Sequence, residues 1–525
     1  MNKSNPLPTS PRGGVLALFT FIALTIVAQP TASQETIEAP SGAVGGVLRL
    51  SLDDCIAMAR RQSIDAAVAL GELRSAYWQW RSYRADLLPE VSLTGTAPSW
   101  NKRYSSYQQA DGSLSFVRND YLGLDGALHI TQKLWPTGGT LSIESSLDYL
   151  HQSGSSSLRG GQEGVNQFMS LPVAVTLSQP LFSVNHLKWN RRIEPLRYRE
   201  AQARFLTETE QVAMQAISLY FGLLLAGEQV NIARQNLQTA EKLYDVAQAK
   251  RRMGTISEND VLQLRLDVLT ARSALTISES NRQATQFALR SFLDIDVPIE
   301  LIVPDSVFGG FAAEIPRLSY TDVLAHALQN NALATTMRRR QMEADYAVAS
   351  ARANRQSINL YAQLGYTGSA DNLNAAYRNL LSNEVVSVGI TVPLLDWGKR
   401  KGQRRMAESN RDIVQGQLRQ QAQNFRQDIF ILTEQFNNQA EQLRIACEAD
   451  TIARRRYHTN VETFKIGSIS TLELSDAQKA KDQARQNRIQ QLFNYWYYYY
   501  QLRSIALWDF ERGCDISEDF EKIIK

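Results

Sequence analysis

The sequence predicts an α+β membrane protein in which very long helices alternate with short β-strands. Three observations predict this fold: an N-terminal secretory signal, two proline-poor stretches with coiled-coil periodicity, and several segments in which apolar and polar residues alternate. The 525 residues are 44% hydrophobic and 21% charged, which permits a large core. A formal net charge of +3 gives no reason to expect nucleic acid as a partner.

The N-terminus resembles a cleavable secretory signal. An apolar run over residues 15–28 follows Lys3 and Arg12 and precedes small residues at 31–33. A run of about 14 residues is too short to span a bilayer, although a retained anchor is the alternative. We therefore expect a signal peptide over residues 1–33, an exported mature chain without a transmembrane helix, and a linker over 34–49.

The three cysteines lie far apart, at Cys55, Cys447 and Cys514, and do not form a disulfide or metal-binding pattern. We expect small, buried thiols at all three positions. None follows the signal closely enough to carry a lipid, so we expect a chain that is not lipidated.

Residues in the first half recur 213 positions later: Gly254 matches Gly467, Pro180 matches Pro393, and Tyr244 matches Tyr457. One shift that aligns a strand end, a helix and a turn predicts an internal two-fold repeat. The motif at Leu50 recurs at Leu318, a shift of 268, so the first half carries about 55 extra residues. The expected organisation is a first repeat over 50–298 (helix 50–88, strand and loop region 90–182, helical hairpin 188–294), a linker over 299–317, a second repeat over 318–511 (helix 319–356, strands 358–395, hairpin 398–510) and a tail over 512–525.

Each repeat is expected to contain one very long helix. Between Lys188 and Met253 the only proline is Pro195, near the start of the stretch, where a first helical turn tolerates it. A helix of about 60 residues would be about 90 Å long, far beyond the usual length in globular domains. Steps of three and four between apolar positions predict a coiled-coil seam, and a fibrous coiled coil is the alternative. These positions are Val230, Ala233, Leu237, Ala240, Tyr244 and Ala247.

The segments between the helices alternate as strands do, with one apolar and one polar face. The apolar positions of these segments are Val91 and Leu93; Leu122, Leu124, Leu128, Ile130 and Leu134; Leu141, Ile143, Leu147 and Tyr149; Val173, Val175 and Leu177; Ile358, Leu360 and Leu364; and Val386, Val388, Ile390 and Val392. Several have the 9 to 11 residues that a tilted membrane strand needs, although strands of a soluble sheet look the same. One chain has too few strands to close a barrel, and an open edge in lipid leaves backbone amides unpaired. Several chains must therefore share one barrel.

Five short motifs follow one another along the chain: Ser51-Leu-Asp-Asp-Cys-Ile-Ala-Met-Ala, Leu87-Leu-Pro-Glu-Val, Gln179-Pro-Leu-Phe, Arg252-Met-Gly-Thr-Ile-Ser and Lys465-Ile-Gly-Ser-Ile-Ser. In this order they resemble the TolC-like outer membrane factor (outer membrane efflux protein) family, and the resemblance covers the chain from Leu50 to about Asp509. It implies a homotrimer whose subunits share a 12-stranded outer-membrane barrel, four strands each, continued by a periplasmic α-helical coiled-coil barrel. It also implies a periplasmic adaptor and an inner-membrane RND or ABC transporter as partners in efflux or type I secretion.

One departure from the family concerns the 55 extra residues. Gln132-Lys-Leu-Trp-Pro-Thr-Gly-Gly-Thr-Leu reads as a hairpin turn between two alternating segments, which would give six strands per subunit and an 18-stranded trimer. The glycine-containing stretch Ser153 to Gln167 lacks the following helix of a phosphate-binding loop, so we expect an extracellular loop.

The resemblance places the functional residues at the helical hairpin ends. Glu473 and Asp476 match the family's acidic constriction ring, where three copies of each would attract cations, although a solvated helix face is the alternative. Phe464 and Ile469 stand where the best-known members have a tyrosine and an arginine that tie the closed end to an acid, here Asp260. We therefore expect a different closed-state lock, involving Lys465 or Arg252. Adaptor docking is expected at the turns, which contain Gly254, Thr255, Gly467 and Ser468.

The remaining features predict structural roles. The run Tyr495-Trp-Tyr-Tyr-Tyr-Tyr is expected to pack in the middle of the helical tunnel. Arg191, Arg192, Arg404 and Arg405 either meet lipid phosphates below the strands or solvate the helix starts. The five histidines have no metal-ligand spacing and no nucleophile motif is present, so we expect no enzyme, no cofactor and no metal. A periplasmic adaptor or a secreted structural coiled coil remains the rival function, and the sequence does not identify the cargo.

Overall fold

A computed structural model describes residues 43–44, 47–108, 112–152, 165–254, 257–302, 317–353, 357–392, 394–465, 468–469 and 471–524. The predicted signal peptide and most of the linker lie outside this part of the chain. The chain divides into a small unit over residues 1–46, in which β1 (Ala43–Val44) is described, and a large unit over residues 47–525. All that follows concerns the large unit.

A six-stranded antiparallel sheet forms from the predicted alternating segments, in the order β3-β4-β5-β6-β8-β9. Its strands are β3 (Glu90–Gln108), β4 (Leu114–Leu134), β5 (Gly139–Gln152), β6 (Val165–Pro180), β8 (Ser357–Ala370) and β9 (Leu380–Thr391). β4 and β5 contain the extra residues of the first half and are joined by a tight turn in which Gly138 has φ +81°. The expectation of six strands is thus confirmed, and the four strands implied by the resemblance are corrected. Residues 153–164 of the expected loop lie outside the described residues, and residues 165–167 begin β6.

The pairing register gives the sheet two chemically distinct faces. Val91, Ile130, Ile143, Val175 and Leu364 stand opposite one another across five strands and form one apolar row. Because side chains alternate along each strand, the polar residues between them share the other face.

That second face carries carboxylates. Asp125 stands directly opposite Asp148, and His129 stands opposite Glu144. Two like charges across a strand pair are unfavourable unless water surrounds them. The sheet is therefore built to place one face against an apolar medium and the other against an aqueous one.

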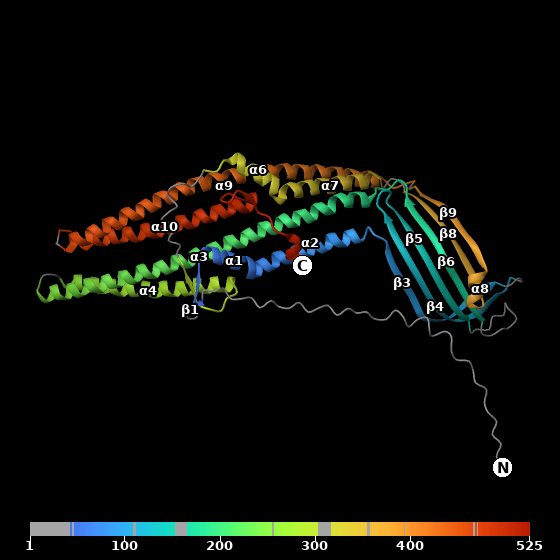
Figure 1. Cartoon of the computed structure of the whole chain (residues 1–525), viewed down its shortest axis with the longest axis horizontal. Helices are drawn as coiled ribbons and strands as arrows, with labels where there is room; N and C mark the ends of the chain where they lie inside the picture. Colours follow the sequence, from blue (N-terminus) through green and yellow to red (C-terminus); the bar gives the residue numbers. More distant parts are fainter. Residues whose placement is uncertain are drawn as a thin grey trace, which may run out of the picture. The chain divides into compact units, whose positions relative to one another are not determined.

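Two helical hairpins continue from the sheet (Figure 1). The first consists of α3 (His186–Arg252) and α4 (Glu258–Phe292), and the second of α9 (Lys399–Lys465) and α10 (Thr471–Ala506). α3 and α9 each have 67 residues, and α9 begins and ends 213 residues after α3. α3 runs through Pro195 in its third turn rather than its first, so the carbonyl of Arg191 lacks its usual helical donor.

Shorter helices complete a wall that is four helices wide. Near the sheet the packing order is α2-α3-α7-α9, and toward the hairpin ends it is α4-α3-α10-α9. The additional helices are α1 (Leu52–Gln62), α2 (Ile64–Ala85), α6 (Tyr320–Asn330) and α7 (Ala332–Ala353), whereas the short α8 (Leu373–Arg378) packs on β6 and β8 of the sheet. In Figure 1 the sheet lies at one end of the large unit and the turns of both hairpins lie at the other.

The helix expected over residues 50–88 is two helices, divided at Ser63. Ser63 has an extended backbone, with ψ 147°, and its hydroxyl accepts a hydrogen bond from the amide of Ala66. Ser51 caps α1 in a capping box with Asp54. In the second half, an extended Asn331 divides α6 from α7 in the same way. A side chain that caps a new helix favours a break which apolar periodicity does not reveal.

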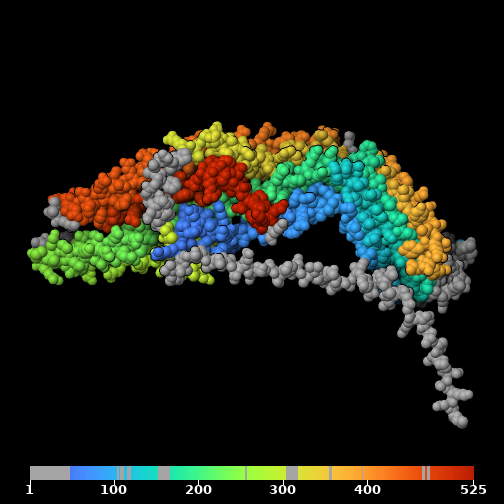
Figure 2. Space-filling model, in the orientation of Figure 1, coloured from blue at the N-terminus to red at the C-terminus, as the bar shows by residue number. Residues whose placement is uncertain are grey.

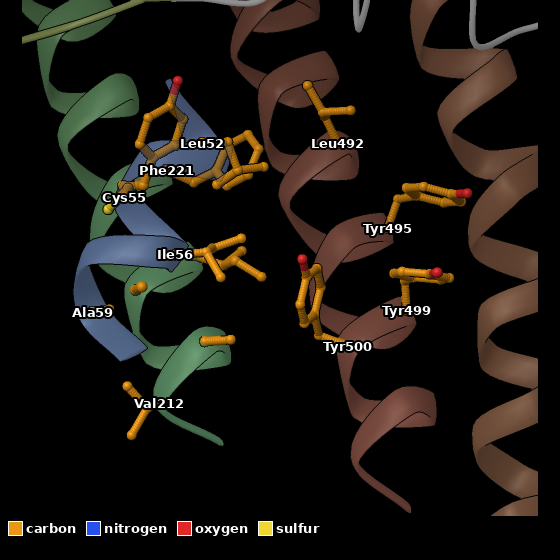
Figure 3. Close-up of a cluster of buried hydrophobic side chains, with 14 of the residues drawn as sticks. Leu52, Cys55, Ile56, Ala59, Val212, Phe221, Leu492, Tyr495, Tyr499 and Tyr500 are labelled. Atoms are coloured by element: carbon orange, nitrogen blue, oxygen red, sulfur yellow. The ribbon is translucent and has the colours of Figure 1, made fainter. Parts of the chain in front are cut away.

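The main core lies halfway along the hairpins, where α1, α3, α9 and α10 meet (Figure 3). Tyr495 and Tyr499 point toward α9, while Tyr500 points toward α1 and α3. This confirms that the tyrosine-rich run packs inside the helical part. The helix α3 is also apolar enough over 18 residues to cross a membrane by composition, but half of that window is buried. Core packing accounts for its apolar character.

Short elements surround this core: β2 (Val47–Leu50) pairs in parallel with β7 (Ile299–Leu301), and β10 (Trp508–Asp509) pairs with β11 (Cys514–Asp515). The final helix, α11 (Phe520–Ile524), packs on a second core between α2 and α3, and Figure 2 shows this red segment beside the blue α2. Of the three cysteines only Cys55 is fully buried. The expectation was wrong for Cys514, which is exposed on the outer strand β11.

Candidate functional site

The first hairpin turns tightly after α3. Met253 caps α3, and Gly254 has φ +70°, a left-handed conformation that glycine adopts without strain. Arg251 forms an ion pair of 3.2 Å with Glu258 across the turn. The predicted turn glycine therefore has a structural role. Thr255 lies outside the described residues, so its predicted docking role stays a prediction.

The second hairpin is described on both sides of its turn. The amide of Ser468 donates to the carbonyl of Thr463 at 3.1 Å, which closes the end of α9. Ser468 is exposed and Ile469 is half-buried. Gly467 lies outside the described residues, as do the side chains of Asp260, Phe464 and Lys465. The proposed closed-state lock therefore stays a prediction.

The two carboxylates of the predicted ring share one exposed face of α10. Glu473 and Asp476 are both exposed, whereas the next residues, Ala477 and Gln478, are only 1% and 7% exposed. With about 100° of rotation per residue, Gln478 points almost opposite the midpoint of the acidic pair, whereas the small Ala477 lies only about 40° from Glu473. Glu473 also lies in the first helical turn, where a negative charge favours the helix start. The helix thus presents both carboxylates away from its packed side.

The packed side of α10 carries a polar stripe that joins the two hairpins. Gln478 donates to Asn236 at 2.5 Å, and Arg485 forms an ion pair of 2.9 Å with Glu228, which is only 11% exposed. Sequence analysis did not identify these residues. One signal was available in the sequence: Lys481 and Arg485 follow Gln478 by three and seven residues. This spacing places all three polar side chains on one face of the helix, the face that packs on α3.

A buried charge cluster fixes the middle of the helical part. Glu210 of α3 is 1% exposed and lies 2.5 Å from Arg60 of α1 and 3.4 Å from Arg503 of α10. Arg503 also forms an ion pair of 3.0 Å with Asp509. The carboxylate of Glu210 therefore links three helices, α1, α3 and α10.

Burial dominates the electrostatics of this cluster. Burial raises the pKa of Glu210 above its ordinary value by more than Arg60 and Arg503 lower it. Burial also raises the pKa of Asp509, but hydrogen bonds from backbone amides and Tyr499, together with Arg503, outweigh it and leave that pKa lowered. Asp509 therefore remains ionised, and Arg503 has a permanent partner.

Among the described residues, no group of three His, Cys, Asp or Glu side chains is arranged to hold a metal ion. The helical part carries an acidic helix face near the hairpin turns and ion pairs between its two hairpins.

Comparison with known proteins agrees with this architecture. The sequence profile described as "Outer membrane efflux protein" matches residues 142–293 and 323–504. These two stretches cover more than half of the chain, and the chain belongs to the outer membrane efflux protein family.

Among characterised relatives, the chain is similar to the alkaline protease secretion protein AprF of Pseudomonas aeruginosa. The two are 24% identical over 271 residues, which are 49% of this chain and 53% of AprF. The match thus spans about half the length of that relative.

Two solved outer membrane channels share the fold. The CmeC channel of Campylobacter jejuni aligns with a TM-score of 0.60 and 15% identity, covering 90% of this chain and 88% of CmeC. The open-state MtrE channel of Neisseria gonorrhoeae aligns with a TM-score of 0.58 and 14% identity, covering 89% and 91%. The predicted family is confirmed, and the family places the chain in the outer membrane.

Proposed function

We propose that three copies of this chain form an outer-membrane exit duct, an 18-stranded barrel above a 12-helix periplasmic tunnel. The duct is passive, and an inner-membrane RND or ABC transporter drives small molecules or polypeptides through it with a periplasmic adaptor. The observation that carries this proposal is that, in the described part of the chain, the six-stranded sheet and the four-helix wall both end in unpartnered edges on the same two sides. The similarity to a secretion protein and to efflux channels supports both kinds of cargo.

The sheet edges are complementary. β3 and β9 each pair with one neighbour in the described part of the chain. Because all five pairings are antiparallel, β3 and β9 run in opposite directions. The edge of β9 in one chain can therefore pair antiparallel with β3 of the next, and a ring satisfies every backbone amide in lipid.

The helix edges are apolar. α4 and α9 are the outer members of the wall near the hairpin ends, and each exposes large aliphatic or aromatic side chains in the single chain. On α4 these are Leu262, Leu266, Leu269, Ile277 and Phe287, and on α9 they include Ile413, Phe430, Ile431, Ile445 and Ile452. Apolar surface of this extent is typical of an obligate interface. Contact between α4 of one chain and α9 of the next would close the tunnel as the strands close the barrel.

An internal duplication is part of this proposal. The 213-residue offset between α3 and α9 supports it, since each half then supplies one sheet segment and one hairpin. The exposed face of α10 supports an acidic ring, because a three-fold axis brings together three copies of Glu473 and Asp476. The hairpin turns at Gly254 and Gly467, with Thr255 and Ser468, are the surfaces we assign to the adaptor. Exposure of Ser468 agrees with that role.

Planar-bilayer conductance tests the duct and its ring together. The wild type is expected to conduct with a preference for cations, and Glu473→Gln with Asp476→Asn is expected to reduce that preference. Glu448→Gln, which neutralises an exposed carboxylate of α9 far from the turn, is the matched control. Unchanged cation preference in the double variant would rule out the ring while leaving the duct intact.

The mass of the assembly tests the shared wall. Detergent-solubilised protein is expected to have the mass of three chains. A stable monomer that remains in aqueous solution without detergent would contradict the proposal, because such a chain must satisfy its sheet edges alone.

A further inference from the structure

A groove lies where the first helices meet the sheet. It is bounded by the end of α2, the start of α3 and the turn between β4 and β5, and has a volume of about 430 Å³. Its lining is aromatic, aliphatic and cationic, and includes Trp80, Tyr83, Arg84, Leu87, Trp135 and Arg191. No carboxylate lines it.

Two guanidinium groups lie over indole rings at this groove. The Cζ atom of Arg191 is 3.8 Å from the ring centre of Trp135, and that of Arg84 is 4.9 Å from the ring centre of Trp80. Stacking holds each guanidinium in place and leaves its N–H edge free to donate. Neither arginine has a carboxylate within 4.0 Å among the residues that the structure describes.

The nearby carboxylates are already paired. Asp86 lies 2.6 Å from Lys133, and Glu194 lies 3.1 Å from Arg197. The two stacked arginines therefore form a local excess of positive charge. Stacking in a groove favours the first of the two alternatives for Arg191, contact with lipid phosphates, because solvation of a helix start does not require it.

Tyr83 adds a buried hydroxyl to the same groove. Its oxygen is shielded from solvent and has no hydrogen-bond partner among the described residues. An unpaired buried hydroxyl is unfavourable, but because the oxygen is shielded, a ligand in the groove reaches it only if the surrounding side chains move. Burial raises the pKa of Tyr83 above its ordinary value, so the hydroxyl remains a donor.

The position of the groove indicates a lipid. Leu87 precedes β3 and Trp135 follows β4, so the groove lies at the helix end of the sheet. Farther from the sheet, α11 covers the adjoining ring of Tyr198 and the second core on α2 and α3. A side that accommodates an extra protein layer is the outside of a wall, where the periplasmic leaflet ends.

Resting on the proposed membrane channel, we infer that this groove binds the phosphate of an anionic phospholipid. The phosphate oxygens accept hydrogen bonds from Arg84 and Arg191, while an acyl chain follows the apolar rows of the sheet. Trp80 and Trp135 flank the headgroup at the level where indoles concentrate in membrane proteins. The site anchors each subunit at a fixed depth in the membrane. An anionic headgroup pairs with the two guanidinium groups better than a zwitterionic headgroup does.

Native mass spectrometry of the full assembly tests this inference. Protein in mixed micelles is titrated with phosphatidylglycerol, with phosphatidylcholine, and with inorganic phosphate as a competitor. We expect phosphatidylglycerol to bind more tightly than phosphatidylcholine. We expect Arg84→Gln and Arg191→Gln each to weaken its binding about fivefold, and the double variant about thirtyfold.

The matched control is Arg81→Gln. Arg81 also lies over an indole, that of Trp78 at 5.1 Å, on the same helix but outside the groove. Equal losses in Arg81→Gln and Arg84→Gln, or unchanged binding in the double variant, would overturn the site. Displacement of the lipid by inorganic phosphate would assign the groove to free phosphate instead. If the double variant does not assemble, the binding of phosphatidylglycerol by Arg84→Gln, which changes an exposed residue, tests the site instead.

Failure of this inference is distinguishable from failure of the channel. Wild-type protein is first inserted into vesicles of phosphatidylcholine and into vesicles of equimolar phosphatidylcholine and phosphatidylglycerol. Conductance in both vesicle types without lipid preference would contradict the lipid site alone. Insertion into neither would contradict the channel itself.

Discussion

Replacing Arg503 with methionine should destabilise the helical part by about 3 kcal/mol. The side chain of Arg503 is 12% exposed and serves both Glu210 and Asp509, at 3.4 and 3.0 Å. Removing one partner of a buried ion pair costs about 3 to 5 kcal/mol, because a charge is left without compensation. We expect a loss at the lower end of this range, because Glu210 keeps its ion pair with Arg60 and Asp509 keeps its hydrogen bond from the hydroxyl of Tyr499.

Chemical denaturation in detergent, followed by far-UV circular dichroism at one protein concentration, measures this loss. Arg485→Met is the control, because Arg485 is 51% exposed in its pair with Glu228 and such pairs contribute about 0 to 1 kcal/mol. Adding Glu210→Gln to Arg503→Met should recover only part of the loss, since it removes one buried carboxylate but leaves Arg60 without Glu210 and Asp509 without Arg503. Equal midpoints for Arg503→Met and Arg485→Met would refute the argument that burial sets the difference.

Three further predictions concern pH, thiol reactivity and assembly. The pKa of Asp509 is lowered from 3.8, so its stabilising contribution is complete above that pH and is lost as the pH falls through the folded value. Asp509→Asn should therefore lower the denaturation midpoint at neutral pH, and the difference in midpoint between the variant and the wild type should disappear in acid. Burial raises the pKa of Cys55 to about 12, whereas Cys514 is exposed. Maleimide should therefore label Cys514 in the folded protein and Cys55 only after denaturation, as peptide mapping would show. Equal labelling of the two cysteines in the folded protein would contradict the described packing. Ile277→Glu should dissociate the assembly, because it places a carboxylate on the apolar edge of α4, whereas Thr276→Glu, about 100° round the helix, should keep the native mass in detergent.

The sequence predicted the repeating elements of this fold well, because strict periodicity has few structural interpretations. Alternation identified the strands, including the added pair around Trp135, since a one-residue shift would exchange the two faces. Breaks were harder. The division of the first helix depends on the hydroxyl of Ser63 bonding to Ala66, a local choice that apolar spacing does not encode.

Tertiary pairings were beyond sequence reasoning. Glu210, Arg60 and Arg503 are separated by 150 residues or more along the chain, and each looks like an ordinary helix charge. Only folding brings them into one buried cluster. The lipid groove is similar: Arg191 was noticed because it lies near a strand end, but its stacking on Trp135 depends on a turn 56 residues earlier. The acidic face of α10 could be predicted because both carboxylates lie on one helix.

The six strands per subunit explain how the two halves of the proposed duct can share one wall. Eighteen strands, about 4.8 Å apart and tilted by about 40°, close at a radius of about 18 Å. Twelve helices about 9.5 Å apart also close at about 18 Å, whereas 12 strands at the same tilt would close at about 12 Å. The added pair β4 and β5 therefore lets each helix continue from the sheet without a step in radius. Deleting the β4–β5 hairpin should consequently force a greater strand tilt or a gap at the junction, and a lower single-channel conductance with an unchanged helical content would be the measurable result.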